Sequence, residues 1–174
     1  MKDHVAIHSS AGEIGQVRGR RFEDDVQAVI DGTAWRPPPH VAALRQRQLR
    51  VGGEFLTDLD ALGVKDGRLL IVSCKSKGLT PQLEMATASA TRNYESMVDA
   101  AFVAAVRLEA QLNATPRGDN FDLSEFSKVL VHVCVPYPFF VASERLLEDW
   151  KDGLMRCTSL AELHTWLTLG RVDH

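Results

Sequence analysis

The first regular feature along the chain is a set of apolar residues with helical spacing. It falls within residues 14–31 and comprises Phe22, Val26, Val29 and Ile30. Gly32 provides a natural end to this helix, and the three prolines that follow it interrupt regular structure. We expect residues 1–13 to form a flexible or peripheral segment in front of it.

A second and longer helical pattern covers residues 82–112. Its apolar stripe comprises Met97, Ala101, Ala104, Ala105 and Leu108. Thr80 suits the N-cap of this helix and Pro81 its first position. Residues 115–127 are polar and rich in turn formers, so we expect a loop there.

Between and after these helices, other segments have the pattern of strands. Residues 48–51 form a short candidate strand before two glycines. Residues 54–77 contain two apolar runs around Lys65-Asp66-Gly67, which predicts a hairpin. Residues 129–135 are almost all apolar and mostly β-branched, which is typical of a strand covered on both faces. We interpret His132 in this strand as a buried core histidine rather than a metal ligand, because no companion ligands have zinc spacing.

The C-terminal third continues the alternation. We expect a helix over residues 143–151, a strand over residues 153–157 and a helix over residues 159–167. Thr158 or Ser159 can cap the last helix, because Glu162 lies near capping-box spacing from both. The order of elements predicts one α/β domain over residues 1–174, with a mixed central sheet.

Composition changes this picture little. The chain has 174 residues, 45% of them hydrophobic and 25% charged, which suits one globular core. No apolar run approaches the roughly 20 residues of a membrane helix, and the N-terminus lacks the apolar core of a signal peptide, so we expect no membrane association. Cys74, Cys134 and Cys157 lie far apart and form no C-x-x-C pair. We interpret them as buried thiols of a cytoplasmic protein.

The distribution of charge is more informative than its sum. A net charge of −3 argues against a strongly electrostatic nucleic-acid binder. Residues 32–53 nevertheless contain no acidic residue and carry four arginines: Arg36, Arg45, Arg47 and Arg50. Together with Lys77, these arginines are candidates for contacts to the phosphates of a nucleic acid. The same pattern also fits a solvated positive face.

The predicted hairpin carries charged residues that a purely structural strand pair would not need. Because strand side chains alternate between faces, Asp58 and Asp60 share a face of the first strand, and Ser73 and Lys75 share a face of the second. Folding the hairpin brings Asp60 beside Ser73 and Lys75. Burying such charges without partners would cost several kcal/mol, so the hairpin predicts a polar site.

These residues resemble the signature of the PD-(D/E)xK nuclease superfamily. The matching positions are Glu23 in G-R-R-F-E-D-D-V, Asp60 in T-D-L-D-A-L and Lys75 in I-V-S-C-K-S. The likeness is strongest to the nuclease domains of CRISPR-associated effectors that carry a CARF sensor domain, and it covers roughly residues 15–168. The resemblance implies a restriction-endonuclease-like α/β core, with a central mixed β-sheet flanked by helices.

The resemblance also implies a chemistry. In this family carboxylates hold Mg²⁺ or Mn²⁺, which activates a water for hydrolysis of DNA or RNA. It makes Asp60 the main metal ligand, Glu23 a further carboxylate for the metal site, and Lys75 the catalytic lysine, with Asp58 as a possible assistant. The expected function is a metal-dependent endonuclease in prokaryotic defence. We expect a homodimer, since the domain is too small to enclose a duplex, and a sensor domain or partner chain.

One position departs from the family pattern. Ser73 stands where an acidic residue is expected, and a hydroxyl is a weaker ligand for hard cations than a carboxylate. Three explanations remain open. Glu84, or Glu95 further along the same helix, supplies the missing carboxylate; Asp58 and Asp60 supply the charge jointly; or the protein is a catalytically impaired module for nucleic-acid binding or assembly.

Overall fold

The computed structural model describes residues 4–76, 87–137, 150–151, 154–155 and 157–170. Its central sheet has the strand order β3-β4-β5-β8. These strands are β3 (Ala61–Lys65), β4 (Arg68–Cys74), β5 (Lys128–Val135) and β8 (Cys157–Ser159). β3 pairs antiparallel with β4, whereas β4, β5 and β8 run parallel. The predicted mixed sheet is therefore confirmed.

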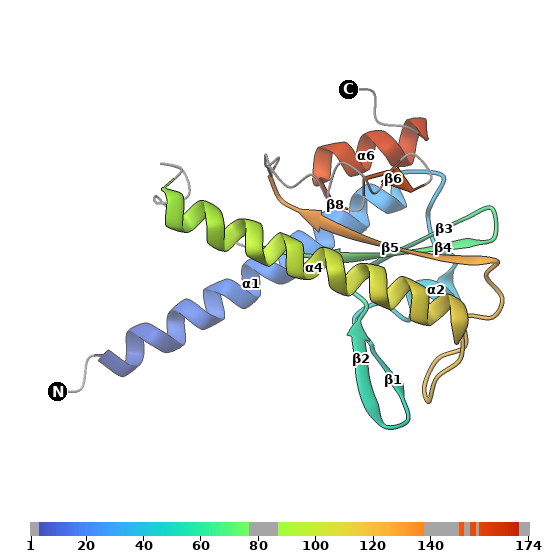
Figure 1. The fold of residues 1–174 in the computed structure, drawn as a ribbon, viewed down its shortest axis with the longest axis horizontal. Coiled ribbons are helices and arrows are strands. Elements are labelled where there is room, and N and C mark those ends of the chain that lie inside the picture. The colour runs from blue at the N-terminus through green and yellow to red at the C-terminus, as the bar shows by residue number, and fades with distance from the viewer. Residues whose placement is uncertain (1–3, 77–86, 138–149, 152–153, 156, 171–174) are drawn as a thin grey trace.

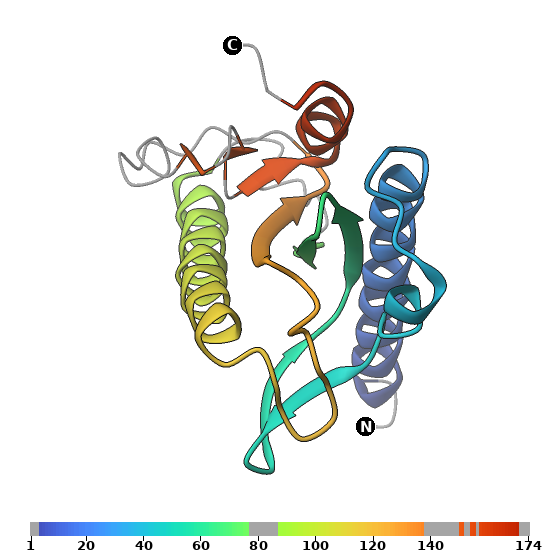
Figure 2. The same cartoon turned by 90° about the vertical axis from the view of Figure 1, so that its right-hand side faces the viewer.

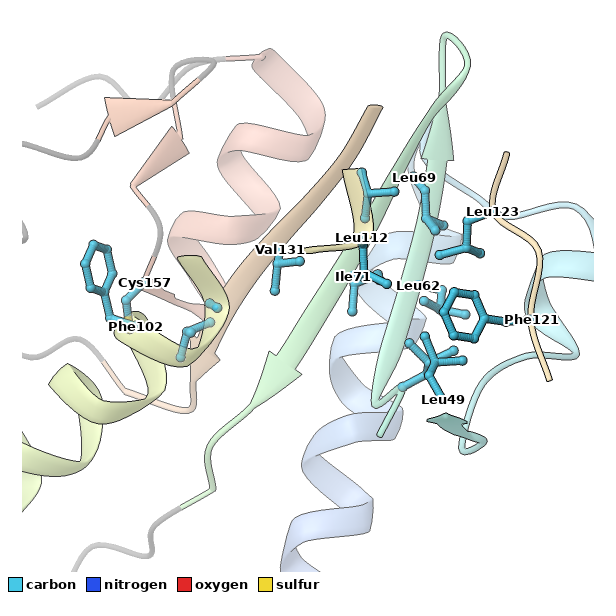
Figure 3. Packing of buried hydrophobic residues seen from close by; sticks show 14 of the residues in the cluster. Leu49, Leu62, Leu69, Ile71, Phe102, Leu112, Phe121, Leu123, Val131 and Cys157 are labelled. Carbon is cyan, nitrogen blue, oxygen red and sulfur yellow. The ribbon is translucent and has the colours of Figure 1, made fainter. Parts of the chain in front are cut away.

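Three helices cover the two faces of this sheet (Figures 1 and 2). They are α1 (His4–Asp31), α4 (Ala88–Ala114) and α6 (Leu160–Leu169). α1 and α6 pack on one face, where Leu70 and Val72 of β4 join their cluster. α4 packs on the other face, where Leu69 and Ile71 of β4 belong to the larger cluster, part of which Figure 3 shows. The fold is thus a helix–sheet–helix sandwich, and alternate residues of β4 face opposite helices.

The strand expected to be covered on both faces is confirmed. Every residue of β5 from Val129 to Val135 is buried. His132 is a core histidine, as predicted: its Nε2 lies 2.8 Å from the hydroxyl of Thr158, and complete burial lowers the pKa of its imidazole to about 3. The ring is therefore neutral at physiological pH. Cys134 and Cys157 are buried free thiols, whereas Cys74 is half-buried.

The hairpin of residues 54–77 differs from the prediction. Its first run is divided between two strands, because β2 (Glu54–Asp58) pairs with β1 (Gln48–Val51) in a separate sheet. Asp58 and Asp60 therefore do not share a strand face. The turn itself is confirmed: Asp66 and Gly67 both have the positive φ of a tight hairpin turn between β3 and β4.

The helices also differ from their predicted limits. α1 begins at His4 rather than near residue 14, and Figure 1 shows its N-terminal part extending beyond the sheet. A short helix, α2 (Pro39–Ala42), begins within the proline run. The capping box that opens α6 is confirmed, since Ser159 and Glu162 cap each other's backbone N–H groups. None of the helices in the described ranges combines the length and apolar character needed to cross a bilayer.

In the C-terminal third, two short strands pair with each other. They are β6 (Trp150–Lys151) and β7 (Leu154–Met155). The helix predicted over residues 143–151 is therefore wrong at its last two positions, and its other residues lie outside the described ranges. So do Thr80 and Pro81, the predicted start of the long helix.

The buried face of α4 overlaps the predicted stripe only in part: Ala105 is buried, whereas Met97, Ala101 and Leu108 are half-buried at its margin. Its buried residues are Tyr94, Val98, Phe102, Ala105, Glu109 and Leu112. Glu109 belongs to this face because its carboxylate accepts the backbone N–H of Val131 at 3.0 Å. Asn113 likewise exchanges two hydrogen bonds with the backbone of Val129, at 2.8 and 2.9 Å. These polar side chains cover a part of β5 that β8 does not reach, since β8 pairs only with the end of that strand.

A side chain of α1 likewise forms hydrogen bonds with the backbone of the edge strand β3. The amide of Gln27 donates to the carbonyl of Leu62 at 3.0 Å and accepts its N–H at 2.8 Å. Gly63 allows this close approach, because a Cβ there would lie 3.1 Å from Cγ2 of Ile30. The register of α1 on the sheet is therefore set by a specific pair of hydrogen bonds.

Candidate active site

Asp60 lies at the point where the chain enters β3, opposite the end of β4. The register pairs Ala61 with Val72, so the next pair along the hairpin is Asp60 with Ser73. The Oδ2 atom of Asp60 accepts the backbone N–H of Cys74 at 2.8 Å. Lys75 continues the line of β4, with its backbone N–H donating to the carbonyl of Cys134 at 2.9 Å. The predicted meeting of Asp60 with Ser73 and Lys75 is thus present.

The Asp60 carboxyl has a raised pKa. Burial raises its pKa above the usual range, and the N–H of Cys74 and the charge of Lys75 oppose that rise only in part. Lys75 influences Asp60 but forms no ion pair within the described part of the chain. A half-buried carboxylate therefore shares one end of the strand pair with a cation that has no ion-pair partner among the described residues.

Glu23 reaches the same place from α1. Burial is the main cause that raises the pKa of its carboxyl, and the negative charge of Asp60 is the second. Gln27 follows Glu23 by about one helical turn, so its hydrogen bonds to Leu62 fix the part of α1 that carries Glu23. The proximity of Glu23 to Asp60 thus depends on the docking of α1 against β3.

Asp58 contributes less to the site than predicted. It is exposed at the end of β2, and its charge is one of the smaller causes that raise the pKa of Asp60. Of the two residues considered as sources of a displaced carboxylate, Glu84 lies outside the described residues, and Glu95 belongs to α4.

The predicted basic residues do not form one patch. Arg45 lies beside the site, where its Nε donates to the carbonyl of Asp60 at 2.9 Å and its guanidinium pairs with Asp24. Arg36 instead donates to the carbonyl of Asp31. The carbonyl of its neighbour in the chain, Trp35, accepts the N–H of Val64 near the far end of β3. Arg36 is therefore separated from Asp60 by most of that strand.

Two other arginines lie on or beside the β1–β2 hairpin. Arg47 is exposed, and its backbone carbonyl accepts the N–H of Leu59 at 3.1 Å, next to Asp60. Arg50 is exposed on β1 and donates to the carbonyl of Gly53. Lys77, the remaining candidate, lies outside the described ranges.

The carboxylates present suit a metal site with two protein ligands. In the part of the chain that the structure describes, no group of three or more His, Cys, Asp or Glu side chains is arranged to hold a metal. Mg²⁺ usually binds one or two carboxylates and completes its shell with water and substrate phosphate. Burial is the main cause that raises the pKa of both Glu23 and Asp60, and a bound cation would favour their charged forms. The residues therefore fit a two-carboxylate Mg²⁺ or Mn²⁺ site.

A cleft of about 140 Å³ lies between β2, β4 and α4, and we call it the β4–α4 cleft. Its lining comprises Leu56, Thr57, Ile71, Ser73, Lys75, Ala101, Ala104, Ala105, Leu108 and Val131. Four of the five residues that the sequence assigned to the core stripe of α4 thus line this cleft. The small size of these four residues, three of which are alanine, was the one signal of the cleft in the sequence.

Comparison of the chain with protein-family models, with curated proteins and with solved structures found no match. A function for this chain therefore has to be inferred from these residues and their geometry.

Proposed function

We propose that the protein is a divalent-metal-dependent nuclease that hydrolyses phosphodiester bonds of DNA or RNA on a restriction-endonuclease-like core. The observation that carries this proposal is the convergence of Glu23, Asp60 and Lys75 from three separate elements at one end of the β3–β4 pair. Two partly buried carboxylates with raised pKa values lie next to a lysine that forms no ion pair with the residues that the structure describes. This combination is typical of a functional site rather than of a stabilising cluster.

Each residue has a role in this proposal. Asp60 and Glu23 would hold Mg²⁺ or Mn²⁺, and the N–H of Cys74 keeps the Asp60 carboxylate oriented. A metal held there would supply activation of the attacking water and a positive charge at the scissile phosphate. Lys75 holds the phosphate and orients the attacking water, because its ammonium is not neutralised by an ion pair in the described residues.

The proposal extends to partners and setting. The exposed Arg47 and Arg50 lie on or next to the β1–β2 hairpin, where they can contact phosphates away from the scissile bond. We also infer that the protein acts in the cytoplasm, as a homodimer with a sensor domain or partner chain. Its three free thiols support a reducing compartment.

A second candidate function is a nucleic-acid-binding or assembly module without catalysis. The observation in its favour is Ser73, which provides a hydroxyl in place of a carboxylate next to Asp60. With Ser73 there, the described residues offer two carboxylates to a metal where the family pattern has three.

A cleavage assay separates the two candidates. Purified protein is incubated with plasmid, linear duplex, single-stranded DNA and RNA, each with Mg²⁺ and with Mn²⁺. The nuclease cleaves at least one substrate, and Lys75→Ala and Asp60→Asn each reduce the rate by roughly 100-fold or more, since each removes a charge that acts on the reacting phosphate. The Asn amide can still accept the N–H of Cys74, so Asp60→Asn preserves the fold.

Matched controls lie at the opposite end of the same hairpin. Lys65→Ala and Asp66→Asn make the same chemical changes at the β3–β4 turn, and asparagine tolerates the positive φ of Asp66. Both variants should cleave like the wild type. A wild type that binds nucleic acid but is inert with both metals on every substrate would support the binding module.

A further inference from the structure

The β4–α4 cleft has a composition that the metal chemistry does not require. Seven of its ten lining residues are apolar, and the exceptions are Thr57, Ser73 and Lys75. A phosphate or a hydrated metal ion gains nothing from apolar walls, because burial against them removes its water without replacement. The cleft therefore suits a group with apolar faces that is joined to an anion beside Lys75.

A nucleobase is such a group. It has flat faces that pack well against alkyl side chains, and a phosphodiester is attached to it through one sugar. Pockets for drug-sized ligands are about 300–1,000 Å³. The β4–α4 cleft, at about 140 Å³, has room for a single ring system but not for a base pair.

We propose that the β4–α4 cleft binds the base of one unpaired nucleotide whose phosphate lies at Lys75. This inference rests on the proposed function, since it places the scissile phosphate at Lys75. Its consequence is a preference for single-stranded nucleic acid, because a base inside a duplex is stacked and paired and cannot enter the cleft without being extruded.

The inference explains why a serine, rather than an acidic residue, stands at position 73. Ser73 lines the cleft, so a carboxylate at this position would place negative charge next to the phosphate that Lys75 holds. A hydroxyl keeps the wall neutral and can donate to or accept from the edge of any base. Thr57 offers a second hydroxyl, which donates to the carbonyl of Asp58 and retains acceptor capacity. We expect little discrimination among the four bases.

Binding measured without divalent metal tests the inference apart from catalysis. The probe is a fluorescein-labelled single-stranded oligothymidylate in EDTA, compared by anisotropy with an abasic strand of the same length and with a duplex of the same sequence. Because a packed base contributes a substantial part of single-strand affinity, wild-type protein should bind oligothymidylate roughly tenfold more tightly than the abasic strand. The duplex should also bind more weakly.

Two variants of adjacent residues on α4 locate the effect. Ala104→Phe fills the cleft from an exposed position and should reduce the preference for bases to less than about twofold. Val103→Phe adds the same ring one residue away, where Val103 is 41% exposed and does not line the cleft, and should leave the preference intact. Equal wild-type affinity for the two strands, or a preference that survives Ala104→Phe, overturns the inference. Base-dependent binding without cleavage would instead refute the nuclease alone.

Discussion

Gln27 offers the sharpest test of how α1 is placed on the sheet. Both backbone groups of Leu62, a residue that is 1% exposed, use the Gln27 side chain as their hydrogen-bond partner. Gln27→Ala removes this partner and leaves a buried N–H and a buried carbonyl at the outer edge of β3. Since Gln27 itself is only 8% exposed, water cannot easily take its place.

The expected magnitude follows from these two groups. An unsatisfied buried backbone group costs about 1–3 kcal/mol, so the pair predicts a loss of roughly 2–6 kcal/mol in the free energy of unfolding. Small domains have about 5–15 kcal/mol in total, so a loss of this size is a large fraction of the stability and readily measured. Asp31→Ala is the matched control, because it removes the other partner of Gln27 but leaves Leu62 satisfied. It should change stability by less than about 0.5 kcal/mol.

Urea unfolding followed by tryptophan fluorescence measures both variants. Trp35 and Trp166 report on the packing of α1 and α6, since their ring centroids are 5.1 Å apart in the cluster that these helices share. The midpoint of Gln27→Ala should fall while the slope with denaturant stays constant. A change below about 0.5 kcal/mol would refute the view that this hydrogen-bond pair holds α1 in register. Divalent-metal binding should also weaken in Gln27→Ala, because Glu23 would lose its fixed position.

Three further predictions concern charge. Asp60→Asn should raise stability at neutral pH, because burial raises the pKa of Asp60 in the folded state. The stability linked to the Asp60 proton is complete below pH 3.8 and is lost as pH rises through the folded-state pKa. Asparagine does not titrate and so does not lose this stability. Thermal unfolding across that pH range measures it, and wild-type metal binding should strengthen over the same rise in pH. Ser73→Glu should increase Mg²⁺ affinity in calorimetry and weaken oligothymidylate binding in EDTA, because it adds a carboxylate both to the metal site and to the wall of the cleft. Arg47→Ala combined with Arg50→Ala should flatten the salt dependence of nucleic-acid binding, since fewer counterions are released, whereas Arg36→Ala should not. Equal slopes for the wild type, the double variant and Arg36→Ala would mean that these arginines only face solvent.

The position of Glu23 illustrates why the site could be predicted only in part. The meeting of Asp60 with Ser73 and Lys75 follows from the hairpin, whose turn residues and alternation act over a few positions along the chain. The approach of Glu23 depends on how α1 docks against β3, through Gln27 and Gly63, which belong to different elements. No local pattern indicates that contact, and the sequence pointed to Glu23 only through the family resemblance.

The sequence by itself determined the features that depend on near neighbours. They include the buried character of β5, the Asp66-Gly67 turn and the cap of α6 by Ser159. Each results from steric or hydrogen-bonding preferences within a few residues, so a linear pattern is sufficient to predict it.

Only the tertiary structure decided which face of α4 is buried. Of the predicted stripe, Ala105 is buried, but the helix is rotated so that Phe102 and Glu109 also face the sheet. Met97, Ala101, Ala104 and Leu108 lie beside that buried face. The buried carboxylate of Glu109 gains the backbone N–H of Val131, a partner 22 positions away along the chain. That rotation leaves the small residues of α4 opposite Lys75 and so creates the β4–α4 cleft. Helix rotation depends on the summed contacts with distant segments, and for that reason it could not be read from the helix alone.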